Sequence, residues 1–223
     1  EAVDAFSITR MELAGYEADD LIATYSKFFS SKGWGVSIIS SDKDLMQLVQ
    51  DSVKMVDPIK NKVIGESEVI EKFGVPPNKV VDVQSLAGDS IDNIPGAPGI
   101  GIKTAASLIN EFGNLENLLL NFASIKQNKR RESIKENLDA IKISKKLVTL
   151  KNDVDVKINA EQISDSCFSV EKLIPFLEKH GFNNLKNRIM SKEHQINDTN
   201  AKTRIQKVEY KNILTKDDLD EFL

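Results

Sequence analysis

A glycine- and proline-rich stretch between Leu86 and Ala106 constrains the fold most, because it forces a tight turn directly before a helix. Its glycines Gly96, Gly99 and Gly101 let the backbone approach a ligand closely. The amides at the start of the following helix, with the charge of a nearby lysine, favour an anion such as phosphate. The alternative is that the prolines and glycines only break one helix from the next. The stretch therefore predicts either a backbone phosphate site or a plain helix break.

Two carboxylates precede these glycines. Asp89 and Asp92 are three residues apart, a spacing that places both on one face of a helical turn and lets both reach one ion. Capping of a turn is the alternative role for this pair. If the pair binds metal, a metal site and a phosphate-binding loop lie side by side.

Two other segments carry five more carboxylates, which are Glu17, Asp19, Asp20, Asp42 and Asp44. The first three form the acidic first turn of a predicted helix. The last two follow a short apolar run at 35–40, which we predict to be a buried parallel strand. Sites of α/β proteins commonly lie at the C-terminal ends of such strands. Simple helix capping is the alternative for each carboxylate, although three within four residues exceed what capping requires.

Sequence patterns also predict the other elements. A hairpin joins strands at 53–56 and 62–64, and helices at 66–73 and 78–86 follow it. Beyond the glycine-rich stretch we predict helices at 104–112, 114–122, 131–150, 170–180 and 184–190, with a short strand at 154–158. The predicted fold class is α/β: a partial parallel-sheet core followed by an all-α subdomain with a helix–hairpin–helix arrangement.

If the seven carboxylates converge, they create a strongly negative cleft. Two like charges about 4 Å apart repel by roughly 1 kcal/mol in water and about 4 kcal/mol near a protein surface, so such a cluster requires cations. Hard oxygen ligands select Mg²⁺ or Mn²⁺ over zinc. Two such ions activate water and stabilise the leaving oxygen in an attack on phosphorus, which predicts phosphodiester hydrolysis.

Composition excludes some classes of protein. The net charge of −4 over 223 residues alone argues against a nucleic-acid partner, but acidic groups gathered in a metal site leave basic surface elsewhere. A basic run from Lys126 to Lys135 is either a solvated face or a phosphate contact. The single cysteine, Cys167, excludes an internal disulfide and fits a reducing cytosol. No apolar run is long enough to span a membrane, so we predict a cytoplasmic protein without a membrane partner.

Three motifs occur in the order of a known nuclease family. They are Gly-Tyr-Glu-Ala-Asp-Asp at 15–20, Ser-Asp-Lys-Asp at 41–44, and Gly-Asp-Ser-Ile-Asp-Asn-Ile-Pro-Gly at 88–96, which Gly99-Ile-Gly-Ile-Lys-Thr-Ala follows. Together they resemble the 5′ nuclease domain of bacterial DNA polymerase I, in the flap endonuclease superfamily with its PIN-like core. The resemblance covers about residues 2–190.

The resemblance implies a role for each motif. The implied catalytic and metal-binding residues are Glu17, Asp19, Asp20, Asp42, Asp44, Asp89 and Asp92. The implied DNA-binding residues are Gly96, Gly99, Ile100, Gly101, Ile102, Lys103 and Thr104. The implied cofactors are two or more Mg²⁺ or Mn²⁺ ions, with K⁺ at the helix–hairpin–helix loop. The implied activity is that of a 5′–3′ exonuclease and flap endonuclease acting on branched duplex DNA in replication and repair.

The sequence departs from this family at its beginning. Family members start with a strand that carries a further metal-binding aspartate and continue into a basic helical arch. We therefore expect a piece of a longer bacterial polymerase, truncated at its N-terminus. A monomer is the expected oligomeric state. We predict a sheet core at 1–83, a helical DNA-binding subdomain at 84–190, a linker at 191–207 and the start of a 3′–5′ exonuclease-like domain at 208–223.

Two functions remain open. The first is metal-dependent cleavage of flapped duplex DNA. The second is a catalytically incomplete DNA-binding module, in which the carboxylates lack their partners. A PIN-like ribonuclease shares the acidic site but has no reason to carry a loop that grips duplex.

Overall fold

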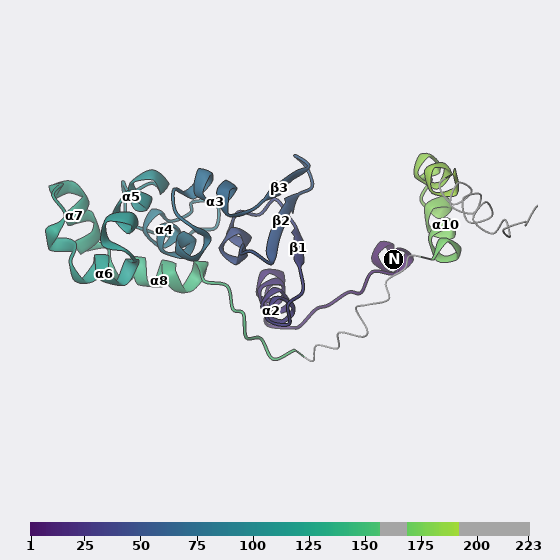
Figure 1. The fold of residues 1–223 in the computed structure, drawn as a ribbon, viewed down its shortest axis with the longest axis horizontal. Coiled ribbons are helices and arrows are strands. Elements are labelled where there is room, and N and C mark those ends of the chain that lie inside the picture. Colours follow the sequence, from purple (N-terminus) through teal and green to yellow (C-terminus); the bar gives the residue numbers. More distant parts are fainter. Residues whose placement is uncertain (157–168, 192–223) are drawn as a thin grey trace, which may run out of the picture. The chain divides into compact units, whose positions relative to one another are not determined.

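The computed structural model describes residues 1–156 and 169–191, which belong to two compact units (Figure 1). Met11–Ile158 forms the larger unit, and Glu1–Arg10 belongs with the later described residues. The predicted linker and the predicted domain start at 208–223 lie outside the described residues, apart from Ser191, which ends a helical stretch. Across the described residues no helix has the length and apolar character needed to cross a membrane.

A small sheet carries the first part of the larger unit. Its strands β1 (Val36–Ile39), β2 (Val53–Asp57) and β3 (Lys62–Ile64) lie in the order β1-β2-β3. β1 runs parallel to β2, and β3 pairs antiparallel with β2, so the predicted hairpin is confirmed.

The strand predicted at 35–40 and its parallel pairing are confirmed, but the prediction that this strand is buried is wrong. Only Ile38 of β1 is buried, and its neighbour Ile39 is 63% exposed. The reason is topological, because β1 lies at the edge of the described sheet and α2 (Ala18–Ser31) packs beside it. Side chains of a strand alternate between faces, so packing on one face leaves the other open.

A helical bundle continues the larger unit. Its elements are α3 (Glu66–Phe73), η2 (Pro77–Lys79), α4 (Val80–Ala87), α5 (Ile102–Phe112), α6 (Leu115–Leu120), η3 (Phe122–Ser124), α7 (Asn128–Glu136) and α8 (Leu138–Val148). α4 lies at its centre and packs against α5 and α8. One hydrophobic core runs from Met55 of the sheet through Phe73 and Leu86 to Ile109 and Ile141, so sheet and bundle share their packing.

The single long helix predicted at 131–150 is wrong. Asn137 breaks it into α7 and α8, with φ −116° and ψ 23°. The Asn137 side chain donates a hydrogen bond to the Ser133 carbonyl oxygen at 2.8 Å. Asparagine competes in this way for backbone groups and favours helix ends. Similarly, residues 154–156 of the strand predicted at 154–158 form no strand, and the last two residues lie outside the described part.

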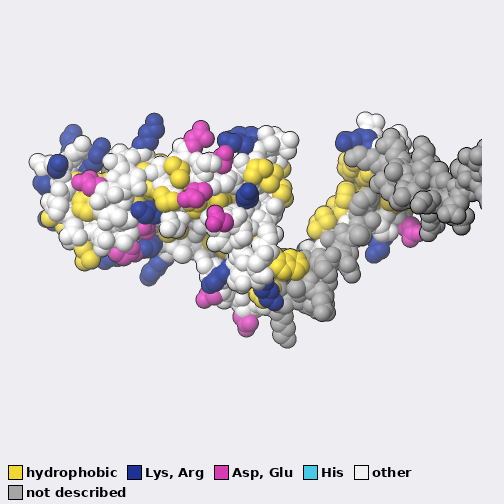
Figure 2. Space-filling view, viewed as in Figure 1, with side chains coloured by type: hydrophobic (Ala, Val, Ile, Leu, Met, Phe, Trp, Pro, Cys, Tyr) yellow, Lys and Arg dark blue, Asp and Glu magenta, His cyan; other side chains and the backbone are white. Residues whose placement is uncertain are grey.

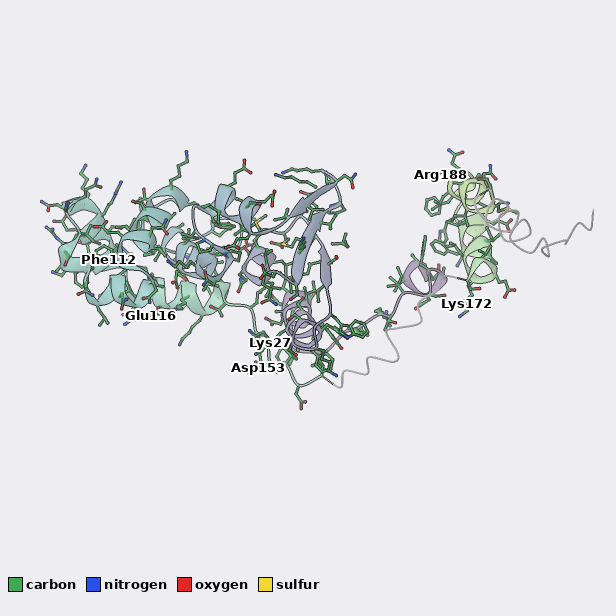
Figure 3. The ribbon with its side chains drawn as sticks, in the orientation of Figure 1. Lys27, Phe112, Glu116, Asp153, Lys172 and Arg188 are labelled. Carbon is green, nitrogen blue, oxygen red and sulfur yellow. The ribbon has the colours of Figure 1, made fainter. Side chains whose placement is uncertain are left out.

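Polar contacts bind the bundle helices to one another. Lys145 on α8 forms ion pairs with Glu116 on α6 and, at 3.5 Å, with Asp82 on α4. Figure 3 labels Glu116. Asp82 also accepts a hydrogen bond from the Leu115 amide at 3.1 Å. These contacts join α4, the helix before the glycine-rich loop, to α6 and α8.

The smaller unit joins the start of the chain to a later helix. α1 (Ala2–Ala5) packs against α10 (Val170–Lys179), and Ala5, Leu173 and Leu177 form their buried contact. Residues 183–191 are helical as well. The helices predicted at 170–180 and 184–190 are therefore confirmed.

Candidate metal centre and phosphate-binding loop

Three elements of the larger unit carry the predicted acidic residues. Glu17 is the N-cap residue of α2, and Asp19 and Asp20 lie in its first turn. Asp42 follows β1, and Asp44 begins η1 (Asp44–Leu48). The last two carboxylates, Asp89 and Asp92, follow α4.

Asp19 and the carboxylates after β1 are close enough to affect one another. Burial raises the pKa of Asp19, and the negative charges of Asp42, Asp44, Glu17 and Asp20 raise it further. Asp42 and Asp44 belong to a different element from Asp19, and the contact between α2 and η1 brings these two segments together. The ionised form of Asp19 is therefore energetically unfavourable in the absence of a cation.

Asp44 is held by a neighbour that sequence reasoning did not single out. Burial raises the pKa of Asp44, a hydrogen bond from Gln84 opposes this, and Asp42 and Asp92 raise it again. The Gln84 amide nitrogen donates to Asp44 at 2.5 Å. Gln84 is 3% exposed, and its amide oxygen has no hydrogen-bond partner among the described residues. A buried glutamine next to a motif residue gives no distinctive sequence signal.

Asp89 has a different environment, because its partner is a cation. The Lys43 ammonium forms an ion pair with Asp89, whose side chain is 8% exposed. This hydrogen bond lowers the pKa of Asp89, burial opposes it, and the Ile91 amide, at 2.9 Å from the carboxylate, lowers the pKa further. Lys43 thus neutralises one predicted metal ligand. No sequence signal indicates this pairing, because the two residues lie 46 positions apart.

The turn that carries Asp89 differs from the predicted helical turn. Asp89 and Ile94 exchange two backbone hydrogen bonds, at 2.9 and 2.7 Å, as an isolated β-bridge. Asn93 has a left-handed φ of 56° within this loop. A closed loop therefore presents Asp89 and Asp92, and the helical-face argument for their proximity does not apply.

Asp20 is engaged by the backbone of a distant segment. Its carboxylate accepts a hydrogen bond from the Lys151 amide at 2.8 Å. The Thr24 hydroxyl, one turn later on α2, donates to the Lys151 carbonyl oxygen at 3.4 Å. Asp20 therefore anchors the segment after α8 to α2, in addition to its predicted metal role.

The carboxylates do not form a complete metal site. Among residues 1–156 and 169–191, no group of three His, Cys, Asp or Glu side chains is arranged to hold a metal ion. The electrostatic contacts do connect Asp19, Asp42, Asp44 and Asp92. A donor set made only of carboxylates fits hard divalent cations such as Mg²⁺ and Mn²⁺. The convergence of all seven carboxylates on one metal centre stays a prediction.

Two glycines hold the glycine-rich loop against the end of α4. A Cβ atom on Gly96 would lie 2.4 Å from the Gly88 nitrogen, and one on Gly88 would lie 2.6 Å from the Ile94 carbonyl oxygen. The Gly96 amide donates to the buried Ser144 hydroxyl at 2.9 Å. This contact brings the loop next to Asp89, the residue after Gly88.

The start of α5 offers free backbone amides. Gly101 is its N-cap residue, and the amides of Gly99, Gly101, Ile102 and Lys103 have no hydrogen-bond acceptor within the part of the chain that the structure describes. Gly99 and Gly101 have open space where a Cβ would be. The amide of Ile100, by contrast, donates to the Ala97 carbonyl oxygen at 3.0 Å. Four of the predicted phosphate-binding positions thus present amides that an anion could occupy.

Comparison with known protein families assigns the chain to two successive domains. The family model described as the 5′–3′ exonuclease N-terminal resolvase-like domain matches residues 1–74, and the model described as the 5′–3′ exonuclease C-terminal SAM fold matches residues 75–171. The chain belongs to the 5′–3′ exonuclease family. The two models meet at residue 74, whereas the predicted boundary at 83 and 84 stays a prediction.

Relatives of this 5′–3′ exonuclease chain include polymerases and a separate exonuclease. DNA polymerase I of Rhizobium leguminosarum is 48% identical over 189 residues, which cover 85% of this chain and 19% of that protein. The 5′–3′ exonuclease of Aquifex aeolicus is 40% identical over 163 residues, 73% of this chain and 55% of that protein. The chain thus spans about a fifth and about half of these relatives.

Solved structures share the fold. T5 5′-exonuclease with bound divalent zinc is 25% identical with a TM-score of 0.60, over 63% of this chain and 52% of that one. T5 flap endonuclease in a complex with DNA and metal ions is 24% identical with a TM-score of 0.58, over the same shares. The predicted α/β core with a helical second part is therefore confirmed.

Proposed function

We propose that this chain is the metal-dependent 5′ nuclease part of a bacterial DNA polymerase I, which hydrolyses phosphodiester bonds of branched or flapped duplex DNA. The observation that carries the proposal is that a group of carboxylates lies next to a loop with free backbone amides. Carboxylates from separate segments raise the pKa of Asp19 and Asp44, and the Gly88–Gly96 contact sets a loop with free amides beside Asp89. Membership of the 5′–3′ exonuclease family supports the reaction class.

The chain's residues divide the work of such a reaction. The carboxylates would hold Mg²⁺ or Mn²⁺ ions, which when bound activate water and stabilise the leaving oxygen. The free amides of Gly99, Gly101, Ile102 and Lys103 would bind backbone phosphates, and such contacts carry no base information. We therefore expect structure-specific and sequence-independent binding. K⁺ at the loop, a monomeric state and a cytoplasmic location remain proposals on the same basis.

One observation favours the second candidate, a DNA-binding module without catalysis. Lys43 forms an ion pair with Asp89, and no three carboxylates of the described residues form a metal site. A like arrangement in solution would leave the loop able to bind DNA while the acidic residues remain inactive.

Cleavage of an end-labelled 5′-flap duplex separates the two candidates. We expect cutting with Mg²⁺, none with a chelator, and none by the Asp89→Asn variant. Asp139→Asn is the matched control, because that carboxylate is 93% exposed on α8, and it should cut normally. DNA retained in a gel shift without cutting under any metal condition would refute the nuclease and leave the binding module.

Lys103 tests the phosphate-binding loop. Lys103→Ala should weaken binding to every sequence and reduce the slope of log affinity against log salt by about one unit, because one phosphate contact is lost. Fluorescence anisotropy in chelator measures this. Lys32→Ala is the control, since Lys32 is the C-cap residue of α2, about 20 Å along the helix from its acidic first turn. An unchanged slope for Lys103→Ala would show that Lys103 does not contact DNA.

A further inference from the structure

A cavity of about 310 Å³ opens between the β2–β3 hairpin and α3. Residues that line it include Ser41, Lys60, Lys62, Glu68, Glu71 and Lys72. We call this cavity the lysine pocket. In Figure 2, Lys or Arg side chains lie next to Asp or Glu side chains over the region of α3 and β3. Ser41 immediately precedes Asp42, so one wall of the pocket leads directly to the candidate metal centre.

Two of the three carboxylates of the lysine pocket accept hydrogen bonds from groups close to them in the sequence. Asp57 also lines the pocket, and it accepts hydrogen bonds from the amides of Ile59 and Lys60 at 2.9 and 3.0 Å. Glu68 accepts one from the Gly65 amide at 2.9 Å and one from the Ser67 hydroxyl at 3.0 Å.

Two of the three lysines act on a carboxylate of the pocket only at longer range, since backbone hydrogen bonds lower the pKa of Asp57 and the charges of Lys60 and Lys72 lower it further. Lys62 forms a loose ion pair with Glu71 at 3.8 Å. Within the described ranges, Lys60 and Lys72 form no ion pair. Lys60 and Lys72 therefore line one cavity without a direct ion pair to the carboxylates that line it with them.

The direction of the Lys72 pKa shift indicates which charged groups lie near its ammonium group. Lys72 as a residue is exposed, but partial burial of its ammonium group lowers its pKa. Lys43 and Lys60 lower it further, whereas Asp42 and Asp44 raise it. Lys72 is thus near both the second lysine and the candidate metal ligands. An anion here would relieve the repulsion between the lysines and lie beside the metal centre.

We propose that the lysine pocket binds one backbone phosphate of the DNA strand adjacent to the phosphate that is cleaved, with Lys60 and Lys72 as its cationic contacts. The proposal rests on the proposed nuclease function, because it identifies the substrate backbone as the ligand. Such a contact fixes the register of the strand over the carboxylates, as phosphate contacts generally do. It adds to the contacts of the glycine-rich loop, which belong to another segment of the chain.

Salt dependence of binding provides the first test. Binding of a labelled 5′-flap duplex is measured by anisotropy in chelator, for the wild type, Lys60→Gln, Lys72→Gln and the double variant. The double variant should bind several-fold more weakly, with the salt slope reduced by about 0.9, the value for one phosphate of B-DNA. Lys32→Gln, at the far end of α2, should match the wild type. Melting temperatures verify folding, and if Lys72→Gln proves unstable, Lys60→Gln alone carries the test.

A neutral backbone provides the second test, because it locates the phosphate. Methylphosphonate linkages are placed singly along the flapped strand on both sides of the cleavage position. One neutral linkage next to that position should weaken binding by the wild type. It should not weaken binding by the double variant, because that variant has already lost the contact between the lysines and this phosphate. If no linkage shows this coupling and the salt slope is unchanged, the lysine pocket does not bind a backbone phosphate. Cleavage by the wild type would still support the nuclease.

Two other outcomes also decide the proposal. Failure of the wild type to bind the flap duplex would overturn the nuclease and the pocket together. Competition by a mononucleotide 5′-phosphate that depends on Lys60 and Lys72, with no coupled linkage in the duplex, would assign the pocket to a free nucleotide and overturn the backbone contact.

Discussion

Replacing Asp19 by asparagine is expected to raise the melting temperature of the metal-free chain while reducing Mg²⁺-dependent cleavage at least about 100-fold. The pKa of Asp19 is raised by burial and by Asp42, Asp44, Glu17 and Asp20, so its charge destabilises the folded state when no cation is present. The neutral isostere removes that repulsion. Cleavage falls because even the partners of metal ligands are typically worth about 10–100-fold.

The pH dependence of stability has a definite sign. A carboxyl whose folded pKa lies above its usual 3.8 binds more protons when folded than when unfolded. Stability in chelator should therefore fall as pH rises from about 3.8 through the folded pKa of Asp19, and Asp19→Asn should lessen this fall. Thermal melts in chelator and in Mg²⁺ across this pH range measure the effect, and Mg²⁺ should stabilise the wild type more than the variant.

Asp153 supplies a control of opposite sign. Its pKa is lowered by the hydrogen bond and charge of Lys151, at 2.9 Å. Asp153→Asn should therefore leave the melting temperature unchanged or lower it, and cleavage should be unaffected. A lower melting temperature for Asp19→Asn in chelator would show that Asp19 is not part of a repulsive carboxylate cluster.

Local sequence signals predicted the elements that have local boundaries. α3 begins after Gly65 and ends at Gly74, whose φ is 73°, and the predicted helix at 66–73 has these bounds. The β2–β3 hairpin follows from its turn, where Asn61 adopts a left-handed φ of 50°. By contrast, no proline or glycine marks the helix break at Asn137 in the sequence. The closed loop at Asp89 depends on backbone pairing with Ile94, which local sequence does not predict.

The candidate site was predictable in its residues but not in its contacts. The motifs named the acidic residues and the glycine loop, because such groups are recognisable by type and spacing. The pairs that position them join residues far apart in the sequence, as in Lys43 with Asp89, Gln84 with Asp44 and Ser144 with Gly96. Such pairs depend on how helices pack, and neither spacing nor composition specifies them.

Gly96 should be the least replaceable glycine of the loop. Gly96→Ala is expected to reduce the free energy of unfolding by about 3 kcal/mol or more, since alanine is strained at its φ of 58° and its Cβ would lie 2.4 Å from the Gly88 backbone. Neither backbone segment can move without losing contacts, because Gly88 is the C-cap residue of α4 and Gly96 is held by its hydrogen bond to Ser144. Urea denaturation measures the loss.

Two neighbouring glycines separate the close contact from backbone strain. Gly99 has a φ of 77° with open space around a Cβ, so Gly99→Ala should cost only about 1–2 kcal/mol. Gly101 has a φ of −89° and open space, so Gly101→Ala should leave stability unchanged. Equal losses for Gly96→Ala and Gly99→Ala would refute the importance of the Gly88–Gly96 contact. Because Asp89 directly follows Gly88, displacement of this contact also moves a candidate metal ligand, so Gly96→Ala should lose cleavage even at temperatures where it stays folded.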